Sequence, residues 1–363
     1  MDNQYSIRNE DIIEWLLRDE RNENEQRING RIEYRRPRII QQRMNWFKLY
    51  DDTNFRRRFH LSKDNFIMIL QKIEQRLIHG TDRNYAIPPV IQLLVVLRFY
   101  ATGSFFLSVA DYCGISETSA QLFVHKVSEA IASLSTEFIK FPSNSDEISK
   151  IQQGNFNISG FIRVIGAIDC FHVRIKSFGG ENSELFRNRK GYFSINVQAI
   201  VNSRLEFIDL VARWPGSTHD STIFDNSRIK AQFENNMFGN GLLLGDSGYP
   251  CLPYLLTPLQ NPQRPAEVLY NEALIRSRCM VERCFGIFQR SFPVLSIGSR
   301  FRTPQKTLTL IMACAVLHNV SRLSATVENY NSERYNNLIR DLEENLHTNE
   351  RTYLIENYFR KLL

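Results

Sequence analysis

Four acidic residues in the middle of the chain lie in sequence contexts that suit a metal-binding or catalytic site. Asp169 interrupts the apolar run 161–168, and Asp246 follows the apolar run 241–245. Both runs predict buried strands, and a carboxylate at the end of a buried strand is costly unless something pairs with it. A divalent cation can pair with several such carboxylates at once, because hard oxygen ligands suit Mg²⁺ and Mn²⁺.

Two further acids have the spacing to join this pair. Glu282 lies in a helical stretch, 36 positions after Asp246 (282 − 246 = 36), which leaves room for a connection and a helix that packs back on the sheet. Asp220 follows a tight turn at 216–219 and opens a helix. We therefore expect Asp169, Asp246 and Glu282 to be catalytic residues and metal ligands. We expect Asp220 to be a fourth metal ligand.

Each acid also has a purely structural interpretation. Asp169 could form a buried salt bridge with an arginine or lysine, and Asp246 could be a turn residue. Asp220 could cap its helix. If it takes part in the metal site, it could either bind the ion or orient a residue that does. Glu282 could lie on a solvated helix face, since Arg278 precedes it by one turn.

With their flanking residues, the four acids form four ordered blocks. These are GAIDCFHV (166–173), WPGSTHDS (214–221), LLGDSGY (243–249) and VERCFG (281–286). The blocks resemble those of PIF/Harbinger transposases and the nucleases derived from them, and residues 190–199 and 317–319 match as well. One departure is Cys170-Phe171, where many relatives have a small residue and threonine. This position is not a carboxylate, so the departure leaves the expected acidic site intact.

The resemblance implies a fold and an activity. The expected α/β fold is an RNase H-like catalytic core, preceded by an all-helical N-terminal region with a helix-turn-helix. The expected activity is that of a metal-dependent DNA endonuclease with Mg²⁺ or Mn²⁺ as cofactor. The implied partners are DNA and a Myb-like DNA-binding protein, with a homo-oligomer left open. The implied location is the nucleus, with the cytoplasm not excluded.

Composition changes along the chain, together with the family resemblance, predict four regions and a linker between the second and the third. Residues 1–45 form a polar, basic arm, and residues 46–140 read as helices. The turn-rich stretch 141–158 predicts a linker or surface loop. Residues 159–325 hold the nuclease core, and residues 326–363 predict a C-terminal amphipathic helix.

A helix-turn-helix is the functional interpretation of residues 107–125. The pattern is a short helix, a turn at Gly114, a cap at Ser116 and a second helix. A structural helical hairpin explains the same pattern, because the second helix carries no strong base-reading side chain.

Several cations and histidines complete the candidate set. Lys190, Arg276 and Arg283 are candidate contacts to the DNA backbone. His172 and His219 lie near acids and could touch a phosphate or orient a ligand, but a structural role explains them equally well.

Composition sets wider bounds. The 363 residues carry a net charge of +6 and are 43% hydrophobic, which fits a globular protein that could bind nucleic acid. None of the 6 cysteines forms a Cys-x-x-Cys pair, so reduced intracellular cysteines are expected. The polar N-terminus predicts no secretory signal, and no apolar run approaches about 20 residues, so no membrane span is expected.

Two other functions compete with a nuclease. A catalytically retired, transposon-derived DNA-binding or adaptor protein would keep the blocks without activity. A glycosidase could use two carboxylates, but four acids exceed that need and no aromatic sugar-stacking pattern accompanies them.

Overall fold

The computed structural model describes residues 44–78, 86–323, 332–340, 342 and 346–363. These residues belong to one compact unit, 42–363. Nearly all of the predicted basic arm, 1–45, lies outside them. Within the described ranges, every helix is too short or too polar to span a lipid bilayer.

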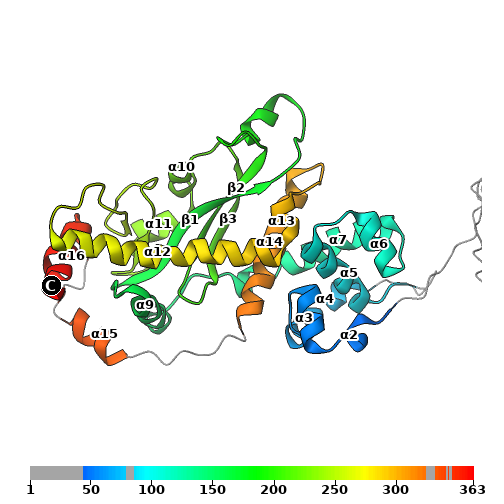
Figure 1. Cartoon of the computed structure of the whole chain (residues 1–363), viewed down its shortest axis with the longest axis horizontal. Helices are drawn as coiled ribbons and strands as arrows, with labels where there is room; N and C mark the ends of the chain where they lie inside the picture. The colour runs from blue at the N-terminus through cyan, green and yellow to red at the C-terminus, as the bar shows by residue number, and fades with distance from the viewer. Residues whose placement is uncertain (1–43, 79–85, 324–331, 341, 343–345) are drawn as a thin grey trace, which may run out of the picture. The chain divides into compact units, whose positions relative to one another are not determined.

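A mixed sheet of five strands, in the order β3-β2-β1-β4-β5, forms the centre of the protein (Figure 1). Strands β1 to β3 pair antiparallel, whereas β4 runs parallel to both β1 and β5. The strands are β1 (Val164–Arg174), β2 (Ser194–Val201), β3 (Phe207–Pro215), β4 (Leu242–Leu244) and β5 (Leu255–Leu256). The predicted α/β class and the predicted hairpin of β2 and β3 are confirmed.

Helices cover both faces of the sheet, as the alternation of side chains along β1 requires. Ala167 and Phe171 join a hydrophobic cluster with α12, while Ile168 joins a second cluster with Phe224 of α10. Asp169 is in phase with Ala167 and Phe171, so its side chain faces α12. The core helices are α9 (Ser145–Ser159), α10 (Asp220–Asp225), α11 (Arg228–Glu234), α12 (Pro265–Ser291), α13 (Pro293–Ile297) and α14 (Pro304–Arg322).

A group of helices precedes the sheet in the chain. They are α2 (Trp46–Leu49), α3 (Asp52–Phe59), α4 (Lys63–Leu77), α5 (Pro89–Thr102), α6 (Phe106–Cys113), α7 (Glu117–Ala132) and α8 (Ser135–Phe138). Helix α5 is apolar on nearly every side, and α3, α4, α6 and α7 pack around it. Helix α7 also packs on α14, so this helical group shares the hydrophobic core of the sheet.

The predicted loop at 141–158 is wrong, because most of it forms α9. The side chain of Asn144 caps the helix by accepting from the Glu147 amide at 2.8 Å, and Glu147 accepts in return from the Ser143 amide. Phe156 is buried, and Asn155 Nδ2 donates to the Val164 carbonyl at 2.7 Å. A few buried contacts with β1 therefore hold a helix whose sequence is mostly polar.

The C-terminal region also differs from the single amphipathic helix predicted over 326–363. The described residues of this region form α15 (Ser332–Ile339), α16 (Glu350–Asn357) and the 3₁₀-helix η2 (Phe359–Leu362). Glu350 forms an ion pair with Arg163 at 3.2 Å, and the two side chains are 0% and 2% exposed. This buried pair fixes α16 to the start of β1.

His318 and Asn319 brace the core, as their place at the end of an apolar helix predicts. Asn319 accepts from the Phe207 amide at 2.9 Å and donates to the Phe207 and Phe138 carbonyls. His318 Nε2 lies 2.8 Å from the Leu205 carbonyl oxygen, and burial lowers its pKa to about 4. The neutral imidazole therefore donates this hydrogen bond and ties α14 to the hairpin.

Asp209 on β3 is a buried acid outside the carboxylate blocks. Among the described residues, its Oδ2 has no hydrogen-bond partner, and desolvation raises its pKa to about 6, against a smaller opposing effect of Arg228. Because the folded state holds the proton more tightly than the unfolded state, Asp209 lowers stability as the pH rises from about 4 to 6. Asp209→Asn should therefore change little near pH 4 and raise the free energy of unfolding by about 1–3 kcal/mol above pH 6. Urea denaturation across this range checks the prediction, and an equal effect at every pH would contradict it.

Candidate active site

Asp169 lies in the middle of β1, partly shielded from solvent, with a side chain that is 17% exposed. Its Oδ1 accepts from the Cys170 amide at 2.7 Å, and its Oδ2 accepts from Arg278 at 3.0 Å. Desolvation raises its pKa to about 6, although these two partners act in the opposite direction. The nearby charges of Asp246 and Asp220 add to the rise, so three acids interact here.

Asp220 is the first residue of α10, and a β2 side chain fixes its position. Asn196 Nδ2 donates to Asp220 Oδ1 at 2.9 Å and to the Thr218 carbonyl at 3.0 Å. The N-cap of α10 is His219, which makes no side-chain capping bond. The hydrogen bond of Asp220 therefore goes to the sheet, which differs from the helix-cap interpretation.

The turn before Asp220 is held by a close packing contact. A Cβ atom at Gly216 would lie 2.3 Å from Ser194 Oγ and 2.6 Å from the Phe186 carbonyl oxygen. Only glycine leaves room for this approach, which explains the Pro-Gly-Ser sequence.

Asp246 follows β4 and lies partly buried beside Asp169. Its Oδ1 accepts from the Gly248 amide at 2.9 Å, which shapes the turn of the Asp-Ser-Gly-Tyr block. Asp246 thus stabilises a turn, as its structural interpretation predicts, and also faces the cavity that Asp169 and Asp220 line. These two roles are compatible, because the turn uses only one carboxylate oxygen.

Glu282 on α12 is farther from this group, and its side chain is 55% exposed. It is joined to Asp169 through Arg278, whose Nη2 donates to Glu282 Oε1 while Nη1 donates to Asp169 Oδ2. The salt bridge anticipated for Asp169 therefore exists, and it involves the arginine one turn before Glu282.

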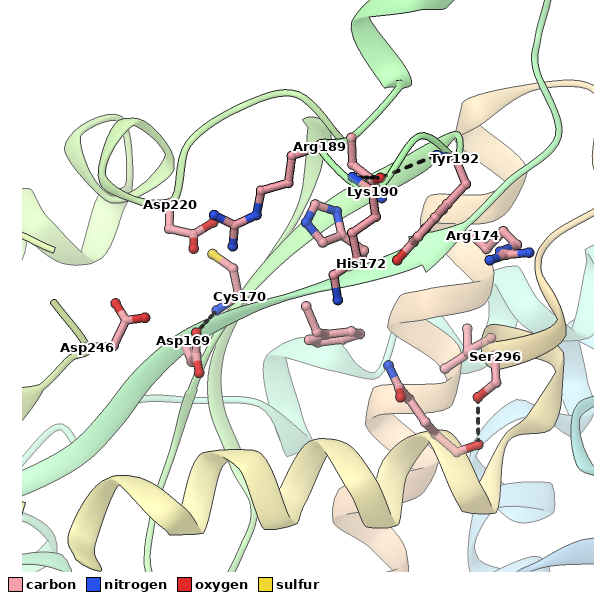
Figure 2. Close-up of a pocket in the computed structure, with 14 residues that line it drawn as sticks. Asp169, Cys170, His172, Arg174, Arg189, Lys190, Tyr192, Asp220, Asp246 and Ser296 are labelled. Atoms are coloured by element: carbon pink, nitrogen blue, oxygen red, sulfur yellow. Dashed lines mark hydrogen bonds between the residues drawn. The ribbon is translucent and has the colours of Figure 1, made fainter. Parts of the chain in front are cut away.

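A cavity of about 460 Å³ brings the three aspartates together with a cationic wall. Asp169, Asp220 and Asp246 lie at one end (Figure 2). The other lining residues include the basic and aromatic side chains of Arg174, Arg189, Lys190 and Tyr192. Glu282 does not line this cavity.

Part of the cationic wall comes from the long connection between β1 and β2, residues 175–193. This connection contains the 3₁₀-helix η1 (Glu181–Phe186). Arg174 ends β1, and its guanidinium lies 4.4 Å from the centre of the Tyr192 ring. Arg189 extends toward Asp220 (Figure 2). The sequence prediction included Lys190 but missed Arg174, Arg189 and Tyr192. Arg189 and Tyr192 lie within two positions of Lys190 in the sequence, whereas Arg174 carried no such signal.

His172 lines the cavity between the acidic and basic ends. Its Nδ1 lies 3.0 Å from Ser194 Oγ, and Asn188 Nδ2 donates to the same oxygen at 2.9 Å. Desolvation lowers the pKa of His172, against an opposing effect of Asp220. His172 is thus oriented at the cavity, whereas His219 is an exposed cap residue.

The three predicted DNA contacts are not brought to one place. Lys190 lines the cavity, whereas Arg276 and Arg283 lie exposed on α12 and do not line it. Arg276 pairs with Glu272 at 3.4 Å, on its own helix.

The chemistry of the acids fits a divalent cation, because carboxylates from β1, α10 and the end of β4 line one cavity, and a fourth carboxylate on α12 lies farther away. As the side chains lie, no group of three or more histidine, cysteine, aspartate or glutamate residues in the described part of the chain could hold a metal ion. Both oxygens of Asp169 already accept hydrogen bonds in this arrangement. The donor types therefore suit the ion, whereas their present arrangement does not bind it.

Comparison with known proteins gives a consistent result. Residues 168–319 match the family described as DDE superfamily endonuclease. The chain is 34% identical over 255 residues to the human protein named "Putative nuclease HARBI1", covering 70% of this chain and 73% of that protein. The protein of the same name from Rattus norvegicus is 35% identical with the same coverage. "Protein ALP1-like" of Arabidopsis thaliana is 26% identical, covering 63% of this chain and 59% of that protein. No solved structure matches the chain significantly.

Proposed function

Because the chain belongs to the family of Harbinger transposase-derived nucleases, we propose that it is a metal-dependent endonuclease that cleaves phosphodiester bonds of DNA. The observation that carries this proposal is the meeting of Asp169, Asp220 and Asp246 in one cavity with a cationic wall. An acidic end suits a metal ion, and a basic end suits a phosphate backbone.

The proposed catalytic residues are Asp169, Asp246 and Glu282, with Asp220 as a further metal ligand. Mg²⁺ or Mn²⁺, when bound, would supply positive charge for activating a water and for stabilising the leaving oxygen. The chain's own contribution is to place carboxylates from β1, α10 and the end of β4 in one cavity, with Glu282 of α12 linked to Asp169 through Arg278. Asn196 keeps Asp220 in place, and the turn at Gly248 keeps Asp246 in place.

The substrate would lie along the basic end of the cavity. Arg189 and Lys190 would contact phosphate oxygens near the cleaved bond, with Arg174 and Tyr192 farther along the strand. Arg276 and Arg283 would reach the duplex only outside the cavity, from the exposed face of α12.

The strand order supports an RNase H-like core as part of the proposal. A central strand that is antiparallel to one neighbour and parallel to the other places Asp169 and Asp246 side by side. A helix-turn-helix role for α6 and α7 is supported by the left-handed Gly114 at their turn and the Ser116 cap. Thr118 and Gln121 of α7 are exposed and could contact DNA.

DNA as substrate places the proposed site of action in the nucleus. A Myb-like protein would supply sequence recognition, since the exposed polar side chains of α7 are weak base readers. A homo-oligomer would allow two DNA ends to be cleaved together.

A retired enzyme that serves as an adaptor is the second candidate. One observation favours it, because Arg278 neutralises two of the four acids. Such a protein would bind DNA at the basic wall without cleaving it.

Metal removal tests the proposed function directly. Supercoiled plasmid carrying a terminal repeat of a Harbinger element should be nicked by the full chain in Mn²⁺ or Mg²⁺, with no nicking after chelation by EDTA. Restoring the ion should restore nicking. Retained DNA binding without nicking in either ion would support the adaptor instead.

A further inference from the structure

Arg278 on α12 connects two carboxylates from different elements. Its Nη1 donates to Asp169 Oδ2 on β1 at 3.0 Å, and its Nη2 donates to Glu282 Oε1 one helical turn away. The Arg278 side chain is 22% exposed, and that of Asp169 is 17% exposed. The first contact is therefore partly shielded from water, where an ion pair is stronger than on an open surface.

The oxygen atoms bound by Arg278 are needed for the proposed metal site. Asp169 Oδ1 accepts from the Cys170 amide, so Oδ2 is the oxygen that Asp169 can offer to another partner. Arg278 holds that oxygen and also Glu282 Oε1. A guanidinium and a divalent ion compete for these atoms, because two positive charges on the same carboxylate oxygen repel each other.

We propose that Arg278 and the divalent ion exchange places on Asp169 and Glu282, and that the released guanidinium then binds a substrate phosphate. Arg278 thus acts first as a positioning residue, keeping two acids from repelling each other and holding α12 beside β1. After release it contacts the DNA backbone. This inference rests on the proposed function.

The chemistry of arginine suits both positions. Its planar guanidinium presents several N–H donors that match carboxylate and phosphate oxygens equally well. Four carboxylates around a divalent ion leave net negative charge beside an anionic substrate. A released arginine at this place would offset that charge where the phosphate must approach.

The same helix offers a matched control. Arg276 lies two residues earlier on α12, is exposed, and pairs only with Glu272 of its own helix in the described structure. Arg276→Gln removes the same charge from the same helix without touching Asp169 or Glu282.

The experiment measures Mn²⁺ binding by calorimetry on the full chain without DNA. Arg278→Gln should bind Mn²⁺ about tenfold more tightly than the wild type, as expected for loss of a competing ion pair worth about 1.4 kcal/mol. Arg276→Gln should stay within about twofold of the wild type, since exposed charges at greater distance are screened. Thermal unfolding of each variant shows whether it is folded.

A second measurement uses the unaltered protein, so it does not depend on how the variant folds. Phenylglyoxal modifies accessible arginines, and peptide mass mapping reports each site. Saturating Mn²⁺ should speed modification of Arg278 severalfold and leave that of Arg276 unchanged. In the nicking assay, Arg278→Gln should cleave more slowly than the wild type even at saturating Mn²⁺, because its phosphate contact is lost.

The outcomes separate this inference from the proposed function. The exchange would be overturned if wild type and Arg278→Gln bound Mn²⁺ with equal affinity. It would also be overturned if Mn²⁺ did not change the rate at which Arg278 is modified. Neither result would contradict the metal site itself. If neither protein binds Mn²⁺, with or without DNA, the metal site itself fails, and the exchange fails with it. Binding by Arg278→Gln alone would support the exchange most strongly.

Discussion

Asp169→Asn should reduce DNA nicking by about 10³-fold or more, because a carboxylate that holds a catalytic ion supplies several kcal/mol to the reaction. The change keeps the size and shape of the side chain, removes its charge and replaces one acceptor oxygen by an NH₂ donor. Folding should survive, since burial already raises the pKa of this carboxyl and an uncharged amide is less costly in the same place. Initial nicking rates at saturating Mn²⁺ measure the effect.

Asp225→Asn is the matched control for this prediction. Asp225 ends α10, is half exposed, and pairs with Lys230 at 2.8 Å outside the cavity. This variant should nick DNA at the wild-type rate. Unchanged nicking in folded Asp169→Asn would contradict the proposed catalytic site, whatever the relatives of the chain do.

Glu350→Gln should lower the free energy of unfolding by about 3–5 kcal/mol, the usual effect of removing one partner of a buried ion pair. The change leaves the Arg163 charge buried at the start of β1, where its guanidinium is 2% exposed. It also weakens the contact of Glu350 Oε2 with the His347 amide. Urea denaturation at neutral pH measures the loss.

The same helix again supplies the comparison. Glu356 pairs with Arg264, but its side chain is 31% exposed. Glu356→Gln should therefore lower the free energy of unfolding far less than Glu350→Gln does. If both variants lost a similar amount of unfolding free energy, the buried Arg163–Glu350 pair would contribute no more to stability than an exposed pair.

Local sequence patterns predicted much of the sheet and its acids. Apolar runs gave β1 and β4, and the alternation around the 202–206 turn gave the β2–β3 hairpin. Helical spacing also indicated that Arg278 could reach Glu282. These features depend on residues near one another in the chain, so the sequence carries their signal.

Contacts between distant segments could not be predicted in this way. The pairing of Arg278 with Asp169 depends on how α12 docks on β1, and the place of Arg189 depends on how the long connection between β1 and β2 folds back. Helix α9 was missed for a different reason. Its cap at Asn144 is visible in the sequence, but its polar composition resembles a loop, and only a few buried side chains such as Phe156 hold it.

The separation of the acids along the chain has a consequence for biosynthesis. Asp169 leaves the ribosome long before Glu282, and the sheet cannot receive α12 until residues beyond 282 have been made. A nascent or truncated chain that ends after β5 would carry three of the acids but lack both Glu282 and Arg278. Such a fragment would keep the basic residues Arg174, Arg189 and Lys190 but lack the guanidinium that pairs with Asp169. The order of synthesis thus delivers together, on the same helix, the fourth carboxylate and the arginine that binds it.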